Sequence, residues 1–188
     1  TSCLLQCHST LSYEVIVVDD GSTDETSDVL SYLNSSKMRK FRIGNSGIEL
    51  ASNFGFAKCR GRYIVRVDAD DKVCFEYLSY VAAYLDHSPR YFYGDYRIID
   101  RKSDTIKSVS LPCFDPQEVR SRGDFLATGT LYNASLLQKY GGYNTGSKNS
   151  GLENYELILR MLKDGILGVH IPQHLFYYRW HGSNMSLT

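Results

Sequence analysis

The stretch Tyr13-Glu-Val-Ile-Val-Val-Asp-Asp-Gly-Ser-Thr-Asp24 decides the fold of this chain. Residues 13–18 are rich in β-branched apolar side chains, which is typical of a strand buried on both faces of a sheet. The acids and the glycine that follow predict a turn at the end of that strand. Ser22 and Glu25 have the spacing of a capping box, so a helix is expected to begin there. The stretch therefore predicts a strand, a polar turn and a helix in succession.

The same alternation continues along the first half of the chain. Strands are expected over 38–43 and 62–67, and a helix over 47–59 lies between them. The residues expected on the core face of that helix are Leu50, Ala51, Phe54 and Ala57, and a further helix is marked by Phe75, Leu78, Ala82 and Leu85. This order predicts an α/β fold, a Rossmann-like αβα sandwich with a mostly parallel central sheet. Ligands bind such sheets beyond the carboxyl ends of the strands.

The second half of the chain is less regular. Helices are expected over 115–122 and 151–164, and extended segments, the first two forming a hairpin, over 91–100, 105–110 and 166–180. The sequence has no internal repeat and no low-complexity linker. Residues 1–188 are therefore expected to form a single domain.

The composition excludes several classes of protein. Of the 188 residues, 43% are hydrophobic and 22% charged, which rules out a disordered or fibrous chain. Lysine and arginine number 21, as do aspartate and glutamate, so no surplus positive charge favours nucleic acid as a partner. No apolar run reaches the roughly 18–20 residues of a transmembrane segment. Five cysteines without a Cys-x-x-Cys pair argue against a zinc site or a disulfide framework, and favour a cytoplasmic location.

Two groups of acidic residues follow predicted strands. Asp68 and Asp70 are two apart in extended chain, so their carboxylates point the same way and can share one hard cation such as Mg²⁺ or Mn²⁺. Asp19 and Asp20 end the first strand, where a carboxylate can accept hydrogen bonds from a nucleobase or a ribose. Gly21 lets the backbone approach a ligand closely. The alternative for both groups is an ordinary acidic turn that leads into a helix.

Three further residues are candidates for chemistry. Glu153 and Glu156 lie three apart on the helix predicted over 151–164, and one of them can act as a general base for a hydroxyl. The alternative is that they are first-turn acids favoured by the helix dipole. His181 lies among glycine and serine in a predicted loop, from which it can reach a bound metal. Most single histidines have no such role.

Six segments, in order, resemble the nucleotide-sugar-dependent glycosyltransferases of family 2, which have the GT-A fold. They are 14–24, 53–55 with 60–64, 67–71, 141–143, 151–157 and 181–186. The resemblance implies an inverting transfer of a sugar from a nucleoside-diphosphate sugar, most readily a UDP-sugar, to a hydroxyl of a glycan or lipid-linked acceptor. It also implies Mn²⁺ or Mg²⁺ as cofactor, a place in polysaccharide biosynthesis, a peripheral position at the inner membrane face, and a homo-oligomer as one option.

The resemblance assigns roles to individual residues. It predicts donor nucleotide contacts at Asp19, Asp20, Gly21, Asn53 and Asp68. It predicts metal ligands at Asp70, Asp68 and His181, with Asp71 in support. It places the catalytic base at Glu153 and Asn154, with Glu156 as a second acid. Residues 1–100 are then the nucleotide-binding half, and residues 101–188 the acceptor-side half.

The chain departs from the family pattern in three places. The family's first strand, which normally lies in the middle of the sheet, has no counterpart in this sequence. The family base is usually the second acid of a Glu-Asp pair, and here that position is Asn154, which cannot accept a proton at neutral pH. An arginine that often contacts phosphate is Ser52 in this chain.

Two other functions compete with sugar transfer. A degenerate module that binds a nucleotide sugar or a glycan without turnover is favoured by Asn154 and by the absent strand. A nucleotidyltransferase also uses acidic metal sites, but it normally has a glycine-rich phosphate loop near its start, and none is visible here.

Overall fold

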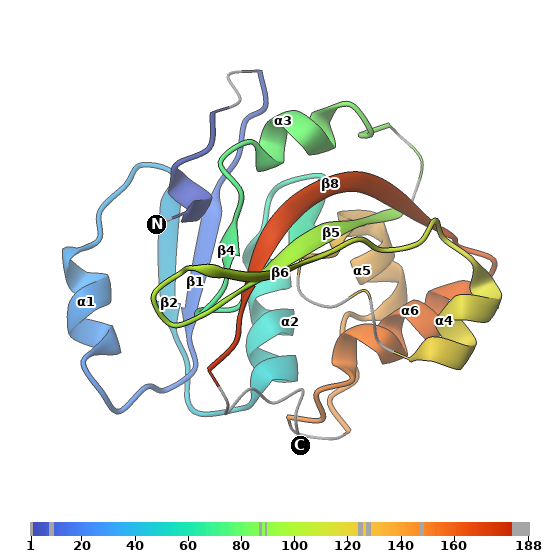
Figure 1. Ribbon diagram of the computed structural model, residues 1–188. Helices are drawn as coiled ribbons and strands as arrows, with labels where there is room; N and C mark the ends of the chain where they lie inside the picture. The colour runs from blue at the N-terminus through green and yellow to red at the C-terminus, as the bar shows by residue number, and fades with distance from the viewer. Residues whose placement is uncertain are drawn as a thin grey trace.

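The apolar run near the start of the chain forms strand β1 (Val15–Asp19), as its β-branched residues predict. Figure 1 shows the computed structural model, which describes residues 2–7, 10–86, 88, 90–123, 126, 129–146 and 149–181. The next two predicted strands are β2 (Met38–Arg42) and β3 (Tyr63–Val65). Helix α2 (Ile48–Lys58) lies between them in the chain.

The remaining elements confirm most of the predicted order. The helices are α1 (Thr26–Tyr32), α3 (Tyr77–Ala82), α4 (Pro116–Arg122), α5 (Ala134–Tyr140) and α6 (Glu153–Lys163), with a 3-10 turn at Ser2–Leu4. The strands are β4 (Lys72–Val73), β5 (Tyr91–Ile99), β6 (Thr105–Val109), β7 (Leu131–Asn133) and β8 (Gly168–Arg179). Of these, β4, β7 and α5 were not predicted.

The strands form two sheets. β1 and β2 pair in parallel, and the larger sheet has the order β3-β7-β5-β8-β4, with β6 beside β5. Within the described residues of the larger sheet, β5 and β8 are parallel and the other pairs are antiparallel. The α/β fold is confirmed, but the expected mostly parallel sheet is wrong. The sheet is mixed, because the short strands β4 and β7 and the β5–β6 hairpin add antiparallel neighbours.

The sheet is interrupted beside β1. Across the described residues, β1 pairs only with β2 and β3 only with β7, so β1 and β3 are not joined.

Two apolar cores lie on opposite faces of the larger sheet. Tyr91 and Tyr93 of β5 pack in one core and Phe92 in the other, as the alternation of a strand requires. Residues of α4, α5 and α6 cover the first core, and Phe56 of α2 packs against it. Helix α3 covers the second core. Figure 1 shows α3 on one side of the sheet and α2, α5 and α6 on the other, which is the expected αβα sandwich.

The predicted capping box of α1 does not form. The helix begins at Thr26, and its N-cap residue, Glu25, makes no side-chain hydrogen bond to the helix. The amide of Thr26 instead bonds to Oδ1 of Asp24 at 3.0 Å, while the amide of Ser22 bonds to Asp19 at 2.8 Å. The helix therefore starts later than predicted, because Asp19 uses Ser22 to close the turn after β1.

The predicted core face of α2 is wrong in part, because Ala51 and Phe54 are half-buried but Leu50 and Ala57 are exposed. Leu50 is 47% exposed, whereas Glu49 is only 2% exposed. The physical reason is that Glu49 and Asn53 bond to backbone of the segment between α5 and α6, and these bonds turn a polar face of α2 inward. A polar face that anchors another segment has no hydrophobic periodicity to reveal it.

Among the residues that the structure describes, no helix has the length and apolar character needed to span a bilayer.

Candidate functional site

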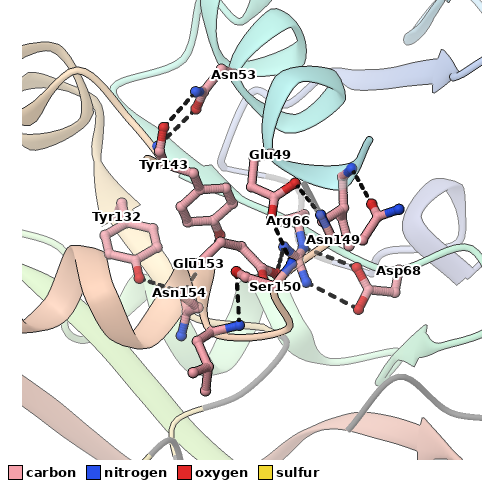
Figure 2. Close-up of polar contacts among 12 residues, drawn as sticks. Glu49, Asn53, Arg66, Asp68, Tyr132, Tyr143, Asn149, Ser150, Glu153 and Asn154 are labelled. Atoms are coloured by element: carbon pink, nitrogen blue, oxygen red, sulfur yellow. Dashed lines mark hydrogen bonds and ion pairs between the residues drawn. The ribbon is translucent and has the colours of Figure 1, made fainter. Parts of the chain in front are cut away.

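A half-buried arginine directly after β3, Arg66, joins two of the predicted site residues. Nε of Arg66 lies 2.9 Å from Oδ1 of Asp68, and Nη2 lies 3.2 Å from Oδ2, so this ion pair is bidentate. Nη1 of Arg66 lies 2.6 Å from Oε1 of Glu153. Figure 2 shows the guanidinium group between the two acids. Positions 68 and 153, far apart in sequence, are thus connected through one cation.

The charge of Arg66 is fixed by its surroundings. Burial alone would lower its pKa, but Tyr143, Asp68 and Glu153 outweigh burial and raise the pKa above its ordinary value. Glu153 is 5% exposed, and its second oxygen, Oε2, is buried with no hydrogen-bond partner among the described residues. One oxygen of Glu153 is therefore bound to a cation, while the other has no partner in the described part of the chain.

Asn154 is held beside Glu153 by two tyrosines. Its Oδ1 accepts a hydrogen bond from the hydroxyl of Tyr132 at 2.5 Å and lies 3.5 Å from the hydroxyl of Tyr143. Asn154 is 6% exposed. Because both tyrosines donate to an oxygen, a carboxylate of the same shape would be accepted at this position.

Asn53 fixes the backbone of Tyr143, one of these two tyrosines. Its Oδ1 accepts from the amide of Tyr143, and its Nδ2 donates to the carbonyl of Tyr143, both at 2.8 Å. Gly142 has a φ of 71°, and a Cβ at that position would overlap Asn53. Asn53 was predicted to contact the nucleotide-sugar donor. Both of its side-chain polar atoms are bonded to the backbone of Tyr143.

The acidic turn after β3 meets the end of β8. Oδ2 of Asp70 lies 2.9 Å from Nε2 of His181, so two predicted metal ligands lie together. Asp71 accepts the amide of Arg179 at 2.8 Å, and burial raises its pKa to about 7. Nε of Arg179 donates to the carbonyl of Asp70 at 2.8 Å. Residues 182–186, the rest of the segment around His181 that resembles the family, lie outside the described residues.

The residues fit a divalent ion that is bound together with a phosphate-bearing ligand. The described part of the chain contains no group of three or more His, Cys, Asp or Glu side chains arranged to hold a metal alone. Both oxygens of Asp68 face Arg66, which leaves Asp70 and His181 as the nearby pair. Mg²⁺ in nucleotide sites commonly has only one or two carboxylate ligands plus substrate phosphates.

Asp19 lies at a hollow on the other sheet. Its Oδ1 accepts the amide of Ser22, and hydrogen bonding to Ser22 lowers the pKa of Asp19 below its usual range. Its Oδ2 lies 3.2 Å from Arg42. The hollow of about 220 Å³ beside Asp19 is lined by residues of α1 and β2, and Asp68 and Asp70 lie outside that lining. Ligand pockets usually run from about 300 Å³, so this hollow has room for only part of a nucleotide.

Asp20 and Gly21 shape the turn before α2. The two oxygens of Asp20 accept the amides of Ser46 and Gly47, each at 2.8 Å. Gly21 has a φ of 76°, and a Cβ there would lie 2.8 Å from the amide nitrogen of Asn45. Only glycine fits this close approach without strain.

Glu49 makes a contact next to these residues that the sequence did not indicate. Its two oxygens accept the amides of Asn149 and Ser150, both at 2.9 Å, and Oδ1 of Asn149 accepts the amide of Ile48 at 3.0 Å. Burial would raise the pKa of Glu49, but the amides of Ser150 and Asn149 outweigh it and hold the pKa below its ordinary value. A single acid at a helix start normally indicates only a favourable dipole interaction, so no sequence signal marked this bond.

We expect Glu49 to give the stability of the fold a pH dependence. A carboxylate with a lowered pKa stabilises the folded state above its unfolded pKa, near 4.5, and this contribution is lost as the pH falls through the folded pKa. At pH 7, Glu49→Gln should reduce the free energy of unfolding by about 1–3 kcal/mol. Urea unfolding between pH 3 and 7 should show the two proteins converging below about pH 4. If the difference in the free energy of unfolding between the two proteins stays constant with pH, this role of Glu49 is contradicted.

Glu156 is not directed at this group of residues. Its carboxylate pairs with Arg160 through two contacts of 2.8 Å, and Nη2 of Arg160 also donates to the carbonyl of Gly142 at 2.7 Å. The structure thus brings together Asp68, Glu153 and Asn154, and separately Asp70 and His181, while Glu156 fastens α6 to the preceding turn.

A family model for glycosyl transferase family 2 matches residues 1–146. The chain belongs to this family. The Escherichia coli chondroitin synthase is 28% identical over 184 residues, which are 93% of this chain and 26% of that protein. The E. coli protein WfaP, named as a UDP-Glc:α-D-GlcNAc-diphosphoundecaprenol β-1,3-glucosyltransferase, is 26% identical over 178 residues, covering 92% and 68% of the two chains.

The solved structures agree with this family-2 fold. S. aureus TarS in complex with UDP-GlcNAc superposes with a TM-score of 0.76 at 20% identity, covering all of this chain and 55% of TarS. An uncharacterized glycosyltransferase of Rickettsia felis is 31% identical over 110 residues, which are 18% of its length. The chain thus spans about a fifth to a quarter of the first curated relatives and about half of TarS.

In this family-2 chain, Arg66 should be essential for stability. Glu153 is buried, so removal of its cationic partner leaves an uncompensated buried charge, and Arg66→Met should reduce the free energy of unfolding by about 3–5 kcal/mol. Arg122→Met is the matched control, because the Arg122–Glu118 pair is exposed and should contribute less than about 1 kcal/mol. Urea unfolding at neutral pH measures both. Equal effects of the two substitutions would contradict the structural role of Arg66.

Proposed function

We propose that this chain is a sugar-transferring domain that moves a sugar, with inversion, from a UDP-sugar to a hydroxyl of a glycan or lipid-linked acceptor. The observation that carries the proposal is the bridge from Asp68 through Arg66 to Glu153. It joins an acid at a strand end, where donors bind in α/β sheets, to an acid whose second, buried oxygen has no partner among the residues that the structure describes.

The choice of a uridine donor is supported by the names of similar proteins. WfaP is named for UDP-Glc, and TarS was crystallised with UDP-GlcNAc. In this chain, Asp19 with its adjoining hollow is the proposed contact for the nucleoside. Asp20 and Gly21 fix the backbone of that turn.

Glu153 is the proposed base. As the acceptor hydroxyl oxygen forms its bond to the anomeric carbon, its proton passes to Oε2 of Glu153, and the bond from that carbon to the diphosphate oxygen breaks. The leaving group is UDP, and attack from the opposite face inverts the anomeric centre. Arg66 holds Oε1 of Glu153, which leaves Oε2 as the proposed proton acceptor.

Asp70 and His181 are the proposed ligands of a divalent ion, Mn²⁺ or Mg²⁺. Such an ion, when bound, neutralises the charge that develops on the diphosphate. The hydrogen bond from Nε of Arg179 to the carbonyl of Asp70 fixes the backbone of the turn after β3 without a bound ligand.

A second function is favoured by one specific observation. The position of the usual family base carries Asn154, whose side-chain amide cannot accept a proton at neutral pH. A module that binds a nucleotide sugar or glycan without turnover would have this arrangement.

Release of UDP from a panel of UDP-sugars, with Mn²⁺ and a mixture of glycan acceptors, separates the two functions. The proposed transferase should release UDP from at least one donor faster when an acceptor is present. Binding of UDP without release from any donor would favour the non-catalytic module and contradict transfer.

A further inference from the structure

The start of α6 is fastened to the start of α2 by a buried carboxylate. Glu49 is 2% exposed, and its oxygens accept the amides of Asn149 and Ser150, which directly precede the turn into α6. We propose that Glu49 is a positioning residue that sets the place of Glu153 and Asn154 in the active site. This inference rests on the proposed function, because it takes Glu153 as the base.

The connection is reciprocal. While Glu49 accepts from the segment before α6, the side chain of Asn149 accepts the amide of Ile48, one of the open amides at the start of α2. Asn149 has a φ of 52°, a left-handed conformation that asparagine tolerates better than most residues. Three hydrogen bonds in two directions thus fix the distance between the two helix starts. Figure 2 shows this contact beside Arg66 and Glu153.

The connection extends toward the nucleotide side of the site. The two oxygens of Asp20 hold the amides of Ser46 and Gly47, just before α2 begins. A continuous run of bonded backbone therefore leads from the turn after β1, through the start of α2, to the segment before Glu153. Two carboxylates hold this run of backbone. Asp20, which is half-buried, accepts amides before α2, and Glu49, which is buried, accepts amides before α6.

The geometry explains why a small change at Glu49 should affect catalysis. Glu153 lies three residues beyond Ser150, and its Oε1 is already fixed by Arg66. If the bonds from Glu49 to the amides of Asn149 and Ser150 loosen, the first turn of α6 can shift. Arg66 then holds that turn only through Oε1 of Glu153. A displacement of about 1 Å at a reacting group can reduce the rate about 100-fold.

The test is Glu49→Gln, which keeps the shape of the side chain but presents an NH₂ group to one of the two amides. Glu76→Gln is the matched control, since Glu76 is exposed at the start of α3 and caps no amide. The readouts are hydrogen exchange at the amides of Asn149 and Ser150, UDP affinity with Mn²⁺, and kcat and KM for UDP release.

Glu49→Gln should speed exchange at those two amides about tenfold or more and lower kcat at least about tenfold. UDP affinity and the donor KM should stay within about twofold, and Glu76→Gln should match the wild type in every readout. Unchanged exchange, or faster exchange with unchanged kcat, would overturn the inference. A parallel loss of kcat and UDP affinity would also overturn it, because that pattern marks general unfolding.

Failure of the proposed function gives a different result, namely no UDP release by the wild-type chain from any donor. If Glu49→Gln does not fold, Asn149→Gly breaks the reciprocal bond and keeps the left-handed backbone. Faster exchange at the amide of Ile48 with lower kcat would then support the inference. Unchanged kcat would overturn it.

Discussion

Asn154→Asp should raise the rate of UDP release from a UDP-sugar by about 100-fold or more, the usual range for a positioned general base. An amide cannot accept the proton of the acceptor hydroxyl, whereas a carboxylate of the same shape can. The hydroxyls of Tyr132 and Tyr143 already point at Oδ1 and would donate to a carboxylate oxygen in the same way. Steady-state UDP release with donor and acceptor present measures the change.

Asn154→Ala is the control for this gain. Alanine leaves the two tyrosine hydroxyls without their acceptor and supplies no base, so it should lower stability and give no increase in rate. If Asn154→Asp folds, binds UDP and releases no more UDP than the wild type, the base does not act from this position.

Glu153→Gln should lower the rate of UDP release about 100-fold or more and leave UDP affinity within about twofold. Glutamine still offers an oxygen to Nη1 of Arg66, so the connection to Asp68 remains, but Oε2, the proposed proton acceptor, is lost. The measurement pairs single-turnover UDP release with calorimetric UDP binding.

Glu156→Gln tests the other predicted acid in the same assay. Glu156 is bound to Arg160, so its substitution should loosen the contact with Gly142 rather than remove a base. If Glu156→Gln abolishes release while Glu153→Gln retains it, the assignment of the base is wrong.

Elements with a strong periodic pattern were predictable from the sequence. The β-branched run of β1 predicts its strand, and the amphipathic pattern of α6 predicts its helix, although β1 is only half-buried and Leu152 of the predicted α6 face is exposed. α4 has Asp115 as a side-chain cap and Pro116 in its first turn, both local signals. Strand β7 has only three residues and runs directly into α5, so its pattern is too short to separate from the helix.

The site was predictable where acids follow strands and unpredictable where distant segments meet. Asp68 and Asp70 were expected because they end a strand, and Asp70 lies 2.9 Å from His181, the other predicted metal ligand, whose metal role stays a prediction. Arg66 gave no signal, because an arginine next to a strand usually faces solvent. Its role exists only once α6 brings Glu153 to it, and no local pattern encodes that approach.

Calorimetric titration of the folded chain with UDP, with and without Mn²⁺, tests the central claim most directly. We expect UDP to bind, and we expect Mn²⁺ to strengthen binding in the wild type and in Asp28→Ala, an exposed control, but not in Asp70→Ala. A folded wild-type chain that binds no UDP in either condition would contradict it.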